Sequence, residues 1–164
     1  MVNSPVPFVT VALTGVCSSE PMTRSLAHPG DTIAITGHVG SSAGGLEVLV
    51  NDAHVPEHTR PYLVDAHRRP HPRIKEGQLL MQNGIRCAMD VSDGLVCDLS
   101  KLCQASGVAA RISLDKVPVH RILQEALPQD YQRLALHGGE EYQLVFTGTY
   151  DKVDRVIMEL STEP

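Results

Sequence analysis

The sequence has no apolar run long enough to cross a bilayer. Residues 1–10 contain two prolines and lack a basic region, so they do not have the form of a signal peptide. No basic block is present either, and the formal net charge is −5. These absences argue against a membrane protein, against export and against non-specific binding of nucleic acid. They do not exclude a phosphorylated ligand, which metal ions and backbone N–H groups can hold in an acidic protein.

Cysteine patterns typical of zinc sites are also missing. No pair among the four cysteines has CxxC spacing, and the eight histidines show no HExxH. Thiols without an export signal indicate the reducing environment of the cytosol. We therefore predict a cytoplasmic protein without a structural zinc ion. The cysteines are Cys17, Cys87, Cys97 and Cys103.

The length of 164 residues suits one domain with a substantial core. Apolar residues make up 42% and charged residues 20%, as in ordinary globular proteins. Predicted strands and helices alternate, which indicates one layered α+β domain, an α/β/α arrangement with a mixed sheet covered by helices. The predicted strands are 7–13, 32–36, 85–89, 108–114 and 143–147. The predicted helices are 46–52, 60–66, 75–83, 95–105, 119–126, 130–136 and 151–160.

An acidic turn between a strand and a helix is the most informative stretch. Asp90, Ser92 and Asp93 follow the strand at 85–89, and Gly94 precedes the helix. Two carboxylates three residues apart across such a turn can meet at one point and hold a hard cation such as magnesium. The alternative is that Asp93 only caps the helix by accepting its first N–H groups. On spacing alone, capping is favoured over metal binding.

A glycine-rich segment, Gly37 to Gly45, lies between the strand at 32–36 and the helix at 46–52. Exposed N–H groups at such a helix start form a candidate anion site. The glycines also permit close packing of the helix on its neighbours, and the sequence does not distinguish the two interpretations.

Three motifs follow one another in the order found in a known family. They are Ile35-Thr-Gly-His-Val-Gly-Ser-Ser-Ala-Gly-Gly-Leu46, Asp90-Val-Ser-Asp-Gly-Leu95 with Asp98-Leu99, and Gly138-Gly-Glu-Glu-Tyr-Gln-Leu144. With Pro70-His-Pro-Arg73 and Ala105-Ser-Gly107, they resemble the C-terminal domain of the thiamine-monophosphate kinases. These enzymes belong to the aminoimidazole ribonucleotide synthetase superfamily. The resemblance runs from about residue 29 to residue 147.

The resemblance implies transfer of the γ-phosphoryl group of ATP to thiamine monophosphate, which gives thiamine diphosphate. It implies Asp90 and Asp93 as Mg²⁺ ligands, Ser92 as a nucleotide contact and Glu140 as a contact to the thiamine substrate. Such a transfer needs positioning and charge neutralisation, and no side-chain nucleophile is required. The alternative is a non-catalytic member of the superfamily, or one that acts on a different acceptor.

The resemblance also implies a domain organisation. Family members have two domains with the site between them and form homodimers through the N-terminal domains. Residues 1–164 correspond to a single C-terminal-type domain, with 1–27 as linker or interdomain strand, and the N-terminal ATP-binding domain is missing. We therefore expect this chain alone to be inactive. Glu141, Ser41 and Glu20 depart from the residues typical of the family and place its nucleotide affinity in question.

Overall fold

The computed structural model describes residues 9–17 and 20–162. The described residues form three strands, seven α-helices and one 3₁₀ turn. The strands are β1 (Thr32–Ile35), β2 (Cys87–Val91) and β3 (Gln143–Gly148). The helices are α1 (Ser41–Val50), α2 (Arg60–Arg68), α3 (Ile74–Gln82), α4 (Leu95–Ser106), α5 (Arg121–Ala126), α6 (Tyr131–His137) and α7 (Tyr150–Thr162), and the 3₁₀ turn is Leu114–Lys116. None of these helices combines the length and apolarity needed to cross a membrane.

The sheet has the order β1-β3-β2, and both pairings are antiparallel. Within the described residues, parallel pairing is limited to one bridge between Thr23 and Cys87 on the outer side of β2. The predicted α+β class is confirmed, but the mixed sheet that we expected is a three-stranded antiparallel sheet with that single parallel bridge. The central strand β3 comes last in the sequence, so the sheet is completed only when residue 143 is reached.

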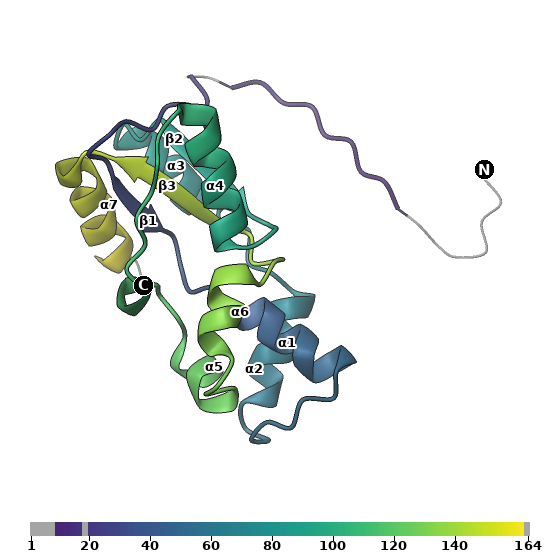
Figure 1. Ribbon diagram of the computed structural model, residues 1–164. Coiled ribbons are helices and arrows are strands. Elements are labelled where there is room, and N and C mark those ends of the chain that lie inside the picture. Colours follow the sequence, from purple (N-terminus) through teal and green to yellow (C-terminus); the bar gives the residue numbers. More distant parts are fainter. Residues whose placement is uncertain (1–8, 18–19, 163–164) are drawn as a thin grey trace.

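Helices cover both faces of the sheet (Figure 1). Side chains alternate between faces along a strand. Val145 therefore packs with Leu99 and Leu102 of α4, whereas its neighbour Phe146 packs with Leu80 of α3 and with α7. All five side chains are nearly or fully buried. This confirms the predicted α/β/α layering.

Four helices, α1, α2, α5 and α6, form a second lobe beside the sheet (Figure 1). The helix α1 begins at Ser41, five residues earlier than predicted, so Gly44 and Gly45 lie inside it. A Cβ at Gly45 would collide with the carbonyl oxygen of Leu63 in α2, and one at Gly44 would lie 2.7 Å from Leu123 of α5. The glycines therefore permit close contact between helices, which favours the packing interpretation of this segment.

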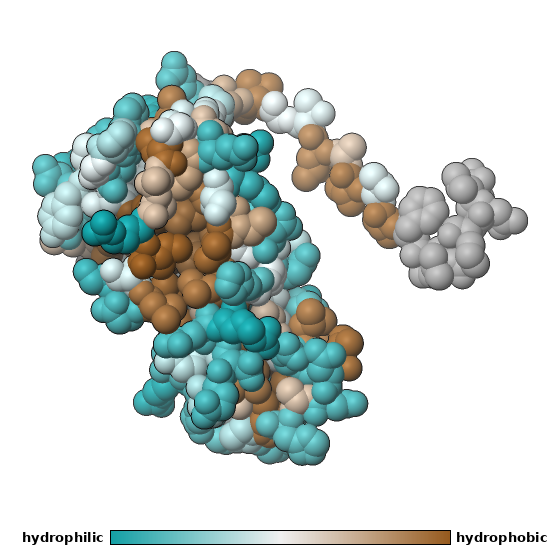
Figure 2. All heavy atoms as spheres, in the orientation of Figure 1, coloured by the Kyte–Doolittle hydropathy of each residue, from teal (hydrophilic) through white to brown (hydrophobic). Residues whose placement is uncertain are grey.

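Two predicted strands are wrong. Residues 9–17 have no secondary structure, their apolar side chains are exposed, and the segment extends away from the body (Figure 1); residues 7 and 8 lie outside the described part. Residues 108–113 do not pair with any strand. A groove of about 590 Å³ lies between them and the edge strand β1, lined by Ile33, Ile35 and Ile112 among others. Figure 2 shows apolar surface in this part of the molecule. Alternation predicts an extended backbone, but a strand also requires a partner at hydrogen-bonding distance.

Candidate functional site

The acidic turn between β2 and α4 is built around Asp98, which is fully buried. Its Oδ2 accepts hydrogen bonds from the backbone N–H groups of Ser92, at 2.9 Å, and Asp93, at 2.8 Å. A buried carboxylate that accepts two N–H groups fixes the backbone of the turn. Gly94 is the N-cap residue of α4 and has φ 109°. A Cβ atom at this position would lie 2.9 Å from the backbone of His137, so only glycine fits here.

Asp93 does not cap the helix, since α4 has no side-chain cap hydrogen bond. The capping interpretation that spacing favoured is therefore wrong for this residue. The Asp93 side chain is 61% exposed, and Asp90 on β2 is exposed as well. Asp93 Oδ2 accepts a hydrogen bond from Lys101 Nζ, and the same Nζ lies 2.7 Å from Asp98 Oδ1. The Asp93 and Asp98 hydrogen bonds hold the pKa of Lys101 above its ordinary value. Lys101 therefore carries its charge between two carboxylates.

Glu140 reaches this turn through backbone pairing between distant parts of the chain. Its N–H donates to the carbonyl oxygen of Ser92 at 2.8 Å, and the N–H of Tyr142 donates to Val91 at 2.9 Å. Both Glu140 and Tyr142 have positive φ, 62° and 52°. Left-handed backbone at residues other than glycine is costly and is found preferentially at functional sites. Thus Ser92, predicted to contact the nucleotide, and Glu140, predicted to contact the second substrate, lie side by side.

Tyr142 connects these carboxylates. Its hydroxyl donates to Glu140 Oε2 at 2.7 Å. The hydrogen bond to Glu140 raises the pKa of Tyr142, and the charges of Asp90 and Asp93 raise it further. All three carboxylates are exposed and act on one phenol, so the four predicted site residues occupy one acidic, solvent-facing region.

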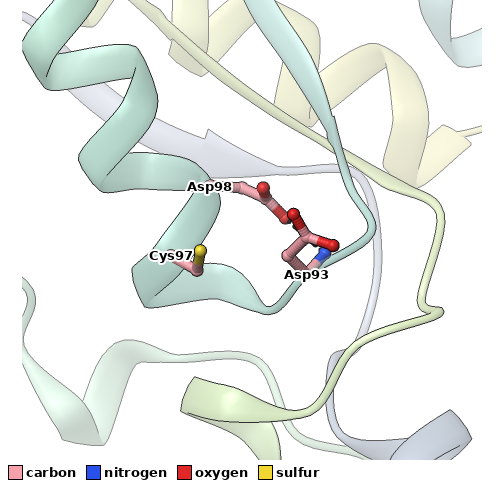
Figure 3. A group of neighbouring side chains, drawn as sticks. All are labelled: Asp93, Cys97 and Asp98. Atoms are coloured by element: carbon pink, nitrogen blue, oxygen red, sulfur yellow. Dashed lines mark hydrogen bonds between the residues drawn. The ribbon is translucent and has the colours of Figure 1, made fainter.

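The described residues contain one group of three side chains with metal-ligand atoms within 4.8 Å of one another: Asp93, Cys97 and Asp98. Figure 3 shows the two carboxylates directed toward each other, with Cys97 on the first turn of α4. Carboxylate oxygens suit a hard cation such as Mg²⁺, whereas a thiolate does not. Asp90 is outside this group.

Sequence reasoning missed Asp98, Lys101 and Tyr142. For Asp98 a signal was available, because it is an acidic residue on the apolar face of α4, beside Leu95, Leu99 and Leu102.

The start of α1 differs from the start of α4, because a side chain from another element closes it. Glu141 Oε1 accepts hydrogen bonds from the N–H groups of Gly40, at 2.8 Å, and Ser42, at 3.0 Å. Burial raises the pKa of Glu141 to about 7, although the N–H groups at the helix start oppose that shift. The helix start that the glycine-rich segment offered as a candidate anion site, one of two interpretations left open, is therefore held by a carboxylate of the protein itself.

Comparison with protein families matches residues 28–146 to the AIR synthase related protein, C-terminal domain. Thiamine-monophosphate kinase of Salmonella typhimurium is 42% identical over 132 residues, which are 79% of this chain and 40% of that protein. The corresponding protein of Bacillus subtilis is 36% identical over 145 residues, 86% of this chain and 43% of that protein. The chain therefore spans less than half the length of these curated relatives.

Solved structures agree with these matches. The crystal structure of thiamine-monophosphate kinase from Stenotrophomonas maltophilia K279a superimposes with a TM-score of 0.81 at 32% identity, covering 90% of this chain and 48% of that one. AaThiL, described as complexed with AMPPCP and TMP, superimposes with a TM-score of 0.72 at 35% identity and covers 79% of this chain and 42% of its own.

Proposed function

Because the chain belongs to the AIR synthase related proteins, having their C-terminal domain, we propose that it is the part of an ATP-dependent thiamine-monophosphate kinase that carries the Asp90–Asp93 turn and Glu140. The observation that carries the proposal is the pairing of residues 140–142 with residues 91–92. It brings a candidate substrate contact to the turn that holds the candidate metal and nucleotide contacts. A kinase that phosphorylates a phosphate needs both reactants at one place.

The acidic turn supports magnesium as the ion. The donor atoms of Asp90, Asp93 and Asp98 are carboxylate oxygens, and a cation, the Lys101 ammonium, is already bound between two of them. Asp90 and Asp93, which are exposed, would hold the ion, and when bound it would neutralise charge on the ATP phosphates. Asp98 is buried and already accepts two backbone N–H groups, so its role is to keep the turn in shape.

The remaining residues bind and orient the reactants. The Ser92 hydroxyl is half-buried at the turn and would donate to a nucleotide phosphate oxygen. Glu140, held by Tyr142, would contact the thiamine substrate. A phosphate oxygen of thiamine monophosphate then attacks the γ-phosphorus of ATP in line, the bond to the β–γ bridging oxygen breaks, and ADP leaves. No residue of this chain forms a covalent intermediate.

The whole enzyme is a larger unit in this proposal. Residues 1–164 act as its single C-terminal-type domain, with an N-terminal ATP-binding domain completing the site. Dimerisation through that N-terminal domain and a cytoplasmic location are part of the same proposal. The chain covers 40% of the Salmonella typhimurium relative, which supports a second domain of comparable size.

A chimera tests this function. The matched 132-residue region of the Salmonella typhimurium kinase is replaced by the corresponding residues of this chain, and thiamine diphosphate is measured after incubation with ATP, Mg²⁺ and thiamine monophosphate. We expect product from the chimera and a strong loss of product on Asp93→Asn. A folded chimera that binds AMPPCP but gives no product, while the parent enzyme does, contradicts the proposal.

A further inference from the structure

The Lys101 ammonium occupies a place in the acidic turn where a positive charge is required. Lys101 and Asp98 are three residues apart on α4, so the helix fixes their pairing. Asp93 lies on the turn that precedes the helix, and its exposed carboxylate is free to point elsewhere. The second hydrogen bond of Lys101, to Asp93, therefore holds that side chain against the helix.

The two partners of Lys101 differ in their need for it. Asp98 is fully buried, and its Oδ2 is occupied by backbone N–H groups, so its Oδ1 needs a partner at all times. Asp93 is 61% exposed and is solvated by water when Lys101 leaves it. Movement of Lys101 away from Asp93 alone thus breaks one exposed ion pair and leaves the buried one intact.

A divalent ion at Asp93 competes with this ammonium. Both cations require the same carboxylate, and two positive charges a few ångströms apart repel each other. We propose that Lys101 is a positioning residue that serves as the resident counter-ion of Asp93 and is displaced from it when a divalent metal ion binds, while it remains paired with Asp98. The inference rests on the proposed function, which supplies the metal role of Asp93.

Direct metal binding tests the displacement without any assay of turnover. Mn²⁺ is titrated into the chain, and free Mn²⁺ is followed by electron paramagnetic resonance. Lys101→Met removes the competing charge, so we expect Mn²⁺ to bind about fivefold more tightly than to the wild type, the change that corresponds to one exposed ion pair. Lys101→Arg keeps the charge and should bind Mn²⁺ within about twofold of the wild type.

Two further variants distinguish a failure of the counter-ion role of Lys101 from a failure of the metal role of Asp93. Lys75→Met removes an exposed ammonium on α3 and controls for net charge. Asp93→Asn should weaken Mn²⁺ binding. If it does so while Lys101→Met leaves the affinity unchanged, the counter-ion role is overturned and the metal role of Asp93 stands. If Asp93→Asn has no effect, or if Mn²⁺ binds neither to the wild-type chain nor to the chimera that supplies the N-terminal domain, the metal role itself is overturned.

A measurement on the wild-type chain covers the case in which Lys101→Met does not fold. Mg²⁺ is titrated while the Asp93 Cγ and Lys101 Cε resonances are followed by nuclear magnetic resonance. Displacement predicts that both resonances shift along the same saturation curve, with Asp98 Cγ shifting less. A Lys101 resonance that stays in place while Asp93 saturates contradicts the proposal.

Discussion

The starts of α1 and α4 are built from the same parts and have different consequences. Each follows a glycine at positive φ, Gly40 at 93° and Gly94 at 109°, and neither has a cap from its own N-cap side chain. Each is stabilised by a buried carboxylate, Glu141 for α1 and Asp98 for α4. At α1 the carboxylate fills the helix end itself. At α4 it binds the N–H groups of the preceding turn and leaves other carboxylates exposed.

This difference separates a structural helix end from a functional one. Glu141 comes from the segment before β3 and closes the start of α1, which leaves no place there for an external anion. Asp98 comes from α4 itself and binds the backbone N–H groups of the turn. The side chains of Asp90 and Asp93 remain exposed to solvent. A glycine-led helix start is therefore a candidate ligand site only when the protein does not supply its own anion.

Removal of the closing carboxylate should give the largest effect. Glu141→Ala leaves the buried N–H groups of Gly40 and Ser42 without an acceptor. At about 2 kcal/mol for each buried unpaired donor, we expect the free energy of unfolding to fall by about 4 kcal/mol in urea titrations. Glu140→Ala, at the exposed neighbouring position, should change it by less than about 1 kcal/mol. Equal losses for both variants would remove the distinction between the two helix starts.

At the start of α4, where Asp93 faces solvent, a substitution should reduce activity and leave stability nearly unchanged. Asp93→Asn in the chimera should lower kcat/KM by about a hundredfold, or about 2.7 kcal/mol of transition-state stabilisation. The melting temperature should stay nearly unchanged, because Asp93 is 61% exposed. Both quantities are measured on the same preparation, by product formation and by circular dichroism. A large loss of stability with unchanged turnover would make Asp93 a structural residue.

Titration of Glu141, at the start of α1, should make the stability of the folded chain depend on pH. Its pKa is about 7 in the folded chain and has an ordinary value of 4.5. Between these values the folded chain holds a proton that the unfolded chain has lost. The stabilisation is therefore complete below pH 4.5 and is lost as the pH rises through about 7. We expect the free energy of unfolding, measured in urea, to fall by about 3 kcal/mol more in the wild type than in Glu141→Gln over this window. A loss that is the same in both proteins would assign the titration to other groups.

The sequence predicted those parts of the molecule that depend on local patterns. The helices with apolar stripes, such as α4 and α7, and the strands β1 and β3 lie within a few residues of their expected positions. The site residues Asp90, Ser92, Asp93 and Glu140 came from the resemblance, and the structure places them in one region.

What failed depended on contacts between distant residues. The strand predicted at 108–114 has no partner strand in the described part of the chain, and alternation does not report on partners. The early start of α1 depends on Gly45 lying against Leu63 of another helix. The closing role of Glu141 joins residues about a hundred positions apart, which no spacing rule predicts. Asp98 and Lys101 were overlooked because their importance comes from where α4 places them relative to the turn.

The smallest effect is expected at Tyr142, which orients Glu140 and has no direct role in binding the metal or the nucleotide in our proposal. Tyr142→Phe keeps the ring and its left-handed backbone but removes the hydrogen bond to Glu140 Oε2. Loss of one such bond, about 1 kcal/mol, should raise the KM of the chimera for thiamine monophosphate about fivefold. The KM for ATP should change little, because the phenol contacts Glu140 and not Ser92. Steady-state kinetics with each substrate varied in turn measure both constants. Equal increases in the two KM values would mean that Tyr142 supports the whole turn, and Glu140 would then lose its separate role in recognising the thiamine substrate.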